Sequence, residues 1–114
     1  MLKKQFRLTK KKDFDRLFQA GSQKYYGNKL AIRLANNDLS YNRFGFMISR
    51  RLCRLAVGRN LIRRRLAALI KQDYPKLQPG HDMVILLLTK QSTIKSADLQ
   101  EELTEAWKRL RIIV

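Results

Sequence analysis

The chain has 114 residues, of which 25 are Lys or Arg and nine are Asp or Glu, for a formal charge of +16 at pH 7. Hydrophobic residues make up 45% of it, which excludes a disordered basic tail and suffices for the core of one domain over residues 1–114. So strong a positive charge predicts a polyanionic partner, either nucleic acid or an anionic membrane surface.

The cellular setting follows from cysteine content and apolar runs. Cys53 is the only cysteine, which excludes an intramolecular disulfide and favours a reducing compartment. Charged residues near the N-terminus argue against a signal peptide, and the longest apolar run, residues 83–88, is too short to span a bilayer. We therefore expect a cytoplasmic protein with no membrane partner.

The first predicted helix covers residues 13–21, with two aspartates near its positive N-terminal end and Gly21 as a stop signal. Phe14, Leu17 and Phe18 lie at i, i+3 and i+4 and share one face. The spacing alone favours ordinary core packing. The other interpretation is an aromatic face that borders a groove where unstacked bases rest.

Two strands are predicted next, at residues 30–34 and 43–49, with a turn cluster at residues 36–38 between them. We expect these strands to pair as antiparallel neighbours across that turn. Residues 22–29 are expected to form a polar connection.

The stretch that follows is the most distinctive, because residues 50–65 contain seven arginines and no acid. A planar guanidinium meets a phosphate with two hydrogen bonds, so such a segment suits nucleic-acid backbone. Residues 50–55 are predicted to be a loop. A helix is predicted from about residue 56 to Tyr74, where Pro75 ends it.

Side chains at 100° intervals divide this helix into two faces. The apolar stripe, which is expected to dock on a sheet, consists of Ile62, Leu66, Leu69 and Ile70. The opposite quarter holds Asn60, Arg63, Arg64, Ala67 and Lys71. A solvated surface is the usual explanation for an arginine run, but solvated helices normally mix charge signs for i,i+4 support. The missing acids therefore favour a nucleic-acid contact.

Residues 81–89 are almost continuously apolar, which predicts a strand buried on both faces inside a sheet. His81 has no second histidine to converge with, so we expect no metal site. A final amphipathic helix is predicted after Ser96 as N-cap, with Trp107 in the core. It holds four of the nine acids and should face away from nucleic acid.

The element order α-β-β-(β)-α-β-α predicts an α+β fold, a small two-layer sandwich of about four strands and three helices. No catalytic constellation is evident: the single His and single Cys are far apart, the acids are scattered, and no phosphate-binding glycine pattern occurs. If the protein takes part in catalysis, another component must supply the reacting groups.

Three segments in order resemble the protein component of bacterial ribonuclease P. Residues 6–21 contain Phe-Arg-Leu, Asp-Phe and Phe-x-x-Gly, similar to the family's opening. Arg50-Arg51 with residues 56–64 are similar to its hallmark, a basic pair followed by Ala and then Arg-Asn-x-Ile-basic-Arg. The third segment is the apolar strand that ends at Lys90 before a last helix. Together they cover most of the chain.

The resemblance implies an accessory subunit of an endoribonuclease in which an RNA subunit carries the chemistry. That enzyme removes the 5′ leader of precursor tRNA by hydrolysis, with divalent ions such as Mg²⁺ held mainly by RNA. The protein would bind the catalytic RNA through its basic helix and the single-stranded leader in a groove between sheet and helices. A left-handed crossover through the basic helix is also implied. No small-molecule substrate is expected.

The resemblance assigns residues by position, with none catalytic and none a metal ligand. Those implied or expected to bind the RNA subunit are Arg54, Arg59, Asn60, Arg63, Arg64, Arg65 and Lys71. Those implied to bind the leader of precursor tRNA are Phe14, Phe18, Arg50, Arg51 and Lys90. The chain departs from the family at Leu61, Ala67 and Thr89, where basic residues are usual.

Two other functions are consistent with parts of the sequence. A general RNA-binding or ribosome-associated structural protein fits the composition equally well. A membrane-surface protein fits less well, because the helix that carries the arginines is expected to bury its other face in a core.

Overall fold

The computed structural model describes residues 3–19, 22–90 and 95–113. One mixed sheet has the strand order β1-β2-β4-β3. Its strands are β1 (Gln23–Tyr26), β2 (Leu30–Asn36), β3 (Arg43–Met47) and β4 (His81–Leu87). The helices are α1 (Lys11–Leu17), α2 (Ala56–Asp73) and α3 (Ser96–Arg109), with short 3-10 turns η1 (Lys4–Phe6) and η2 (Tyr74–Lys76). This α+β architecture confirms the predicted fold class.

The predicted pairing of β2 with β3 is wrong, because β4 lies between them. β4 pairs antiparallel with β2 and parallel with β3. Its nearly continuous apolar sequence is what a strand needs when both faces are covered, and the predicted interior position of residues 81–89 is confirmed.

β1 was also not predicted, since residues 22–29 were expected to be a connection. Of its four residues only Tyr25 is buried, so it lacks the apolar alternation typical of a strand. Backbone pairing with β2 makes it a strand nonetheless. The hairpin is closed by a hydrogen bond from the Gly27 amide to the Leu30 carbonyl, at 2.8 Å.

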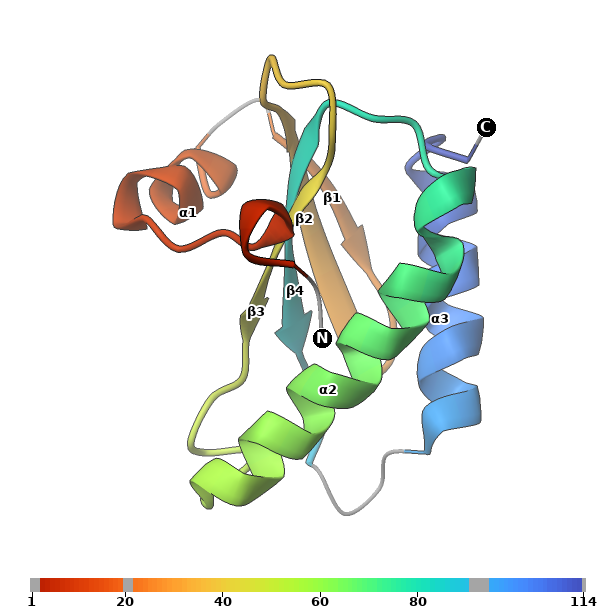
Figure 1. Cartoon of the computed structure of the whole chain (residues 1–114). Helices are drawn as coiled ribbons and strands as arrows, with labels where there is room; N and C mark the ends of the chain where they lie inside the picture. The colour runs from red at the N-terminus through yellow and green to blue at the C-terminus, as the bar shows by residue number, and fades with distance from the viewer. Residues whose placement is uncertain (1–2, 20–21, 91–94, 114) are drawn as a thin grey trace.

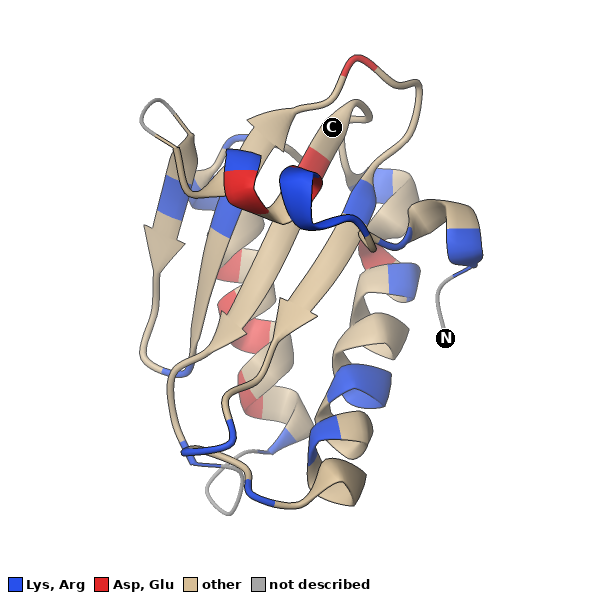
Figure 2. Ribbon diagram, turned by 90° about the vertical axis from the view of Figure 1, so that its left-hand side faces the viewer, with Lys and Arg blue, Asp and Glu red and all other residues tan. Residues whose placement is uncertain are grey.

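The connection β3–α2–β4 is a left-handed crossover. In Figure 2 both strands run downward, β4 lies to the left of β3, and α2 lies on the face away from the viewer. Connections between parallel strands are right-handed in nearly all folds. The unusual hand that the family resemblance implied is therefore confirmed.

Two apolar cores lie on opposite faces of the sheet. α2 and α3 cover one face, and α1 crosses one end of the other (Figure 1). The larger core, between the sheet and α2 and α3, includes Ile32, Ile62, Ile85 and Trp107, which confirms Trp107 as a core residue. The smaller core under α1 consists of Leu8, Leu17 and Val84.

α2 begins and ends close to the predicted limits, but its buried face is wider than predicted. Ala67 was placed on the polar quarter and is 1% exposed. α2 packs against α3 as well as the sheet, so more than one side of it is covered. The predicted stripe residues Ile62, Leu66 and Ile70 are buried, and Leu69 is partly buried.

Helix limits differ from the predictions at three other points. α1 begins at Lys11, two residues early, and ends at Leu17, while Gly21 lies outside the described residues. Ser96 is the first residue of α3, not its cap, and Lys95 occupies the cap position without a side-chain hydrogen bond. Among the described residues, no helix has both the length and the hydropathy needed to cross a membrane.

Candidate RNA-binding site

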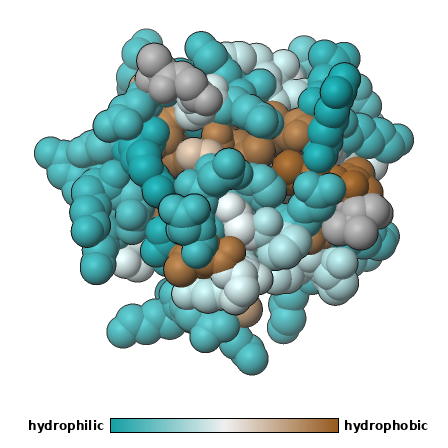
Figure 3. Space-filling model, turned by 90° about the horizontal axis from the view of Figure 1, so that it is seen from above, coloured by the Kyte–Doolittle hydropathy of each residue, from teal (hydrophilic) through white to brown (hydrophobic). Residues whose placement is uncertain are grey.

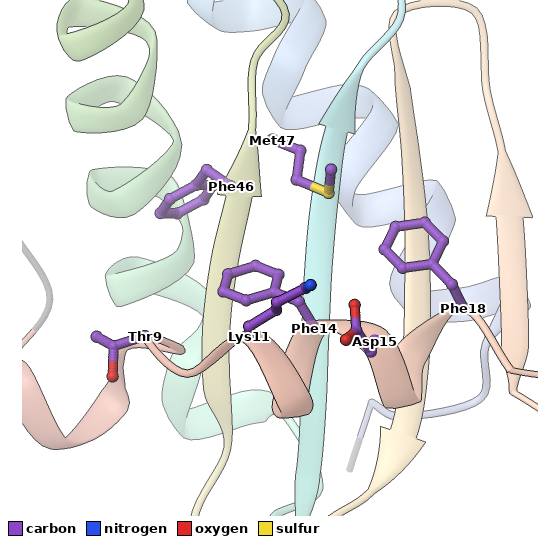
Figure 4. A pocket seen from close by; sticks show the side chains of 7 residues that line it. All are labelled: Thr9, Lys11, Phe14, Asp15, Phe18, Phe46 and Met47. Atoms are coloured by element: carbon purple, nitrogen blue, oxygen red, sulfur yellow. The ribbon is translucent and has the colours of Figure 1, made fainter.

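A groove lies between α1 and the sheet, at the end of β3 (Figure 4). Its volume is about 630 Å³. The lining residues are Thr9, Lys11, Phe14, Asp15, Phe18, Phe46 and Met47. The Phe14 and Phe18 rings and the Met47 thioether suit flat, apolar ligands such as nucleobases. The ring of Phe46 packs against the larger core instead.

Phe14 is fixed in this groove by a close approach to the sheet. An added Cβ on Gly45 would lie 2.5 Å from Cε1 and 2.6 Å from Cζ of Phe14. The glycine thus leaves the space that the ring fills, and α1 can sit directly on β3.

Phe18 is the most accessible aromatic ring of the groove, with 41% of its surface exposed. The guanidinium carbon of Arg33 lies 4.9 Å from the centroid of this ring, a cation–π geometry. Leu17, between the two phenylalanines, is fully buried. The face is therefore divided: Leu17 packs in the core, and Phe14 and Phe18 line the groove. That unstacked bases rest in this groove stays a prediction.

The sheet continues this surface beyond α1. Side chains alternate along a strand, so Tyr26 projects on the α1 side because its neighbour Tyr25 packs in the core. Tyr26 is 63% exposed, and Met47 and Leu88 are also exposed. Sequence reasoning missed Arg33, Tyr26 and Met47, although their alternation with core residues is the signal that could have found them.

A charged cluster attaches α1 to the start of β4. Asp82 is fully buried and accepts two hydrogen bonds from Arg43, from Nε to Oδ1 at 2.8 Å and from Nη2 to Oδ2 at 2.7 Å. Arg16 of α1 donates to Oδ2 of the same carboxylate, and Asn37 Nδ2 donates to Oδ1 at 2.9 Å. Arg43 Nη1 lies 3.6 Å from Oδ2 of Asp13, also on α1. Hydrogen bonding with Asp82 is the main cause that raises the pKa of Arg43.

The loop between β3 and α2 carries three exposed arginines, Arg50, Arg51 and Arg54. Arg59 holds the end of this loop, because its Nη1 donates to the carbonyl oxygens of Cys53, at 3.0 Å, and Arg54, at 2.9 Å. The loop predicted for residues 50–55 is confirmed. The guanidinium of Arg59 is half-buried on the backbone, where the sequence had suggested a residue facing RNA.

The outer face of α2 holds the exposed residues Asn60, Arg64 and Lys71. Arg63 is half-buried, and its Nη1 donates to Oδ1 of Asn60 at 3.1 Å. Arg65 is also half-buried, on the other flank of the helix. Leu61 and Val57 are exposed one turn apart on this helix, so the leucine that replaces a family-typical basic residue adds apolar surface beside the arginines.

Two groups of predicted leader-binding residues lie along one side of the sheet. β3 and β4 are parallel neighbours, so their carboxyl ends meet at one edge. Arg50 and Arg51 follow β3, and the exposed Lys90 follows β4. The aromatic groove reaches the same edge at Met47, the last residue of β3. The structure thus brings Phe14 and Phe18 to one end of a path and the three cations to the other.

Charge is divided between the two long helices. In Figure 2 the basic segments concentrate on α2, the loops and α1, while the acidic segments lie mainly along α3. Viewed from above, hydrophilic side chains cover most of the surface, and apolar side chains show in the hollows between them (Figure 3). Within the described residues, no three His, Cys, Asp or Glu side chains converge where they could hold a metal ion.

A basic helix, an aromatic groove on a mixed sheet and a left-handed crossover together define a small, strongly basic protein of the α+β class. The family model described as Ribonuclease P matches residues 2–111. The chain belongs to the ribonuclease P protein family.

Curated relatives agree over most of the chain. The sequence is 33% identical to the ribonuclease P protein component of Cyanothece sp. over 92% of this chain and 89% of that protein. It is 32% identical to that of Alkaliphilus metalliredigens over 94% of this chain and 95% of that one.

Solved structures share the fold. The RNase P protein of Staphylococcus aureus superposes with a TM-score of 0.84 at 20% identity, covering 96% of this chain and 98% of that one. The RNase P protein of Thermotoga maritima gives a TM-score of 0.79 at 20% identity, covering 90% and 96%.

Proposed function

We propose that this protein is the accessory subunit that helps a catalytic RNA remove the 5′ leader from precursor tRNA. The observation that carries this proposal is the path from the Phe14–Phe18 groove to the carboxyl edge of β3 and β4. It offers stacking surfaces at one end and the exposed cationic side chains of Arg50, Arg51 and Lys90 at the other, which is what a single strand requires.

The leader is the part of the substrate that this path would bind. Bases would stack on Phe18 and Phe14, each worth about 1–3 kcal/mol by analogy with other single-strand sites. Arg50, Arg51 and Lys90 would contact phosphates. Because mature tRNA has lost its leader, these contacts favour substrate over product.

The outer face of α2, together with Arg54 of the loop before it, is the proposed surface for the RNA subunit. Arg54, Arg63, Arg64, Arg65 and Lys71 supply positive charge, and Asn60 adds a polar group beside Arg63. Arg59 acts indirectly, by fixing the loop that presents Arg54. Release of counterions would provide most of the affinity, which should therefore fall steeply with salt.

The hydrolytic chemistry is assigned to the RNA subunit, with divalent ions such as Mg²⁺ held mainly by RNA. The protein's own residues bind and orient the two RNA molecules. The expected location is the cytoplasm, with no membrane and no small-molecule substrate involved.

Reconstitution tests the proposal. The protein is added to a bacterial ribonuclease P RNA at a magnesium concentration at which the RNA alone is inactive. Cleavage of precursor tRNA at the mature 5′ end is expected. RNA binding without any stimulation would instead favour a general RNA-binding or ribosome-associated protein.

A further inference from the structure

α1 and its C-cap residue carry the two phenylalanines of the groove, Phe14 and Phe18, but α1 is a short helix with few attachments to the sheet. It has seven residues, too few for a helix to be stable alone. Its apolar attachments are Leu17 in the small core and the Phe14 ring on Gly45. Apolar contacts are not directional, so these two do not by themselves fix how α1 is rotated on the sheet.

The charged cluster supplies the missing directional contacts. Arg16 and Asp13 lie three residues apart on α1, on the side that faces the sheet, and each pairs with a charge there. Arg16 meets Asp82, and Asp13 meets Arg43, which itself forms a two-point bond to Asp82. Two acids and two arginines thus form a neutral cluster around one fully buried carboxylate.

We propose that Asp82 is a positioning residue for the substrate groove. Through Arg16 and Arg43 it sets the rotation of α1, and thereby the place of Phe14 and Phe18 relative to Met47. This inference rests on the proposed function, because it assigns Asp82 to the binding of the leader.

Burial of a carboxylate at this position argues for a role beyond stability. Removing a charge from water carries a penalty that its partners repay only in part, and apolar replacements of buried ion pairs are often no less stable. Val84 lies two residues after Asp82 on β4, on the same face of the sheet, and packs in the small core. An apolar side chain therefore suits this surface. The charge at residue 82 gives α1 a single geometry that apolar packing does not.

The test uses Asp82→Asn, with Asp38→Asn as the matched control. Both variants lose one negative charge, and Asp38 is exposed in a turn at a φ of 60°, which Asn tolerates well. If charge alone mattered, both variants would bind RNA slightly more tightly. We expect Asp82→Asn to reduce the ratio of the affinities for precursor and mature tRNA about tenfold, which corresponds to the loss of about one base stack. Asp38→Asn should retain it.

A structural measurement accompanies the binding assay. The ring current of Phe14 shifts the Hα resonances of Gly45, which can be followed by NMR in the free protein. We expect Asp82→Asn to move these resonances toward unshifted values and Asp38→Asn to leave them in place. This readout requires no RNA.

A second pair of variants covers the case in which Asp82→Asn does not fold. Arg16→Met removes the α1 side of the contact at a residue whose side chain is 39% exposed. Lys12→Met removes an equal charge from an exposed position on the same helix. Arg16→Met should reduce the precursor preference and the Gly45 shift, and Lys12→Met should change neither.

The outcomes separate the two hypotheses. A folded Asp82→Asn that keeps both the preference and the shift overturns the positioning role, as does an equal loss for precursor and mature tRNA. A wild-type protein with no preference for precursor overturns the leader-binding function instead. In that case the Gly45 shift still decides whether Asp82 positions α1.

Discussion

The ring of Phe14 fills the space that a β-carbon would occupy on Gly45. The two residues are 31 positions apart, and the contact joins α1 to the middle of β3. A glycine at this point therefore serves the groove, because any larger residue would push α1 away from the sheet.

Gly45→Ala should lower both stability and leader binding. The added methyl group overlaps the ring by more than a small shift can relieve, and overpacking of this kind costs about 1–3 kcal/mol. Urea unfolding measures the first effect, and relative affinity for precursor and mature tRNA measures the second. The double variant Gly45→Ala/Phe14→Ala serves as the control, since removal of the ring should restore part of the lost stability.

Phe18→Ala should weaken binding of precursor tRNA by about 1–3 kcal/mol, the value of one base stack, and leave mature tRNA almost unaffected. Phe14→Ala should act in the same direction. Phe18→Leu keeps an apolar side chain but no ring, so it should resemble Phe18→Ala if stacking is the cause. Equal losses for the two tRNAs, measured by equilibrium titration, would contradict a leader-specific role.

Arg64→Ala should weaken binding to the catalytic RNA and reduce the slope of log K against log salt by about 1, as expected for one lost phosphate contact. Arg109→Ala is the matched control, because Arg109 is an exposed arginine on α3 that pairs with Glu105. Titrations at several salt concentrations distinguish the two helices. A similar change in slope for both variants would mean that α2 is not the preferred surface.

Alkaline pH should destabilise the protein through Tyr74. Its hydroxyl donates to the backbone carbonyl of Asn42 and accepts from the Asn42 amide, and burial is the main cause that raises its pKa above 10.0. A raised folded-state pKa means that this contribution is complete below pH 10 and is lost as pH rises through the higher folded-state value. Unfolding in urea between pH 8 and pH 11 should show this loss. Tyr74→Phe should be less stable at pH 8 and show a shallower alkaline decline.

The sequence predicted those helices and strands whose apolar pattern lies within a short segment of the chain. The helix of the arginine stretch and the interior strand were found because their apolar periodicity or continuity is visible within about ten residues. β1 was not found, since only one of its four residues is buried and it lacks apolar alternation. The strand pairing was wrong because it depends on β4, which lies far along the chain from both partners. The left-handed crossover came from the family resemblance alone.

The candidate site was predicted in part, for a similar reason. Phe14 and Phe18 were found from helical spacing, and the structure places them in the groove. Met47 and Arg33 were missed: alternation marks them as facing away from the core, but only the pairing order of the sheet brings them beside the residues of the groove. The hydrogen bonds of Arg59 to loop carbonyls were also missed. The sequence pattern does not indicate whether an arginine side chain binds the backbone or extends into solvent.

The position of β4 has a consequence for synthesis on the ribosome. The sheet cannot close until residues 81–87 have been made, because β4 joins β2 to β3. By then the seven arginines of residues 50–65 have already been synthesised, on a chain whose folded core is incomplete. Pairing over such sequence distances also slows folding. The nascent protein therefore carries the arginines of α2 and of the loop before it while the sheet on which α2 packs is still incomplete.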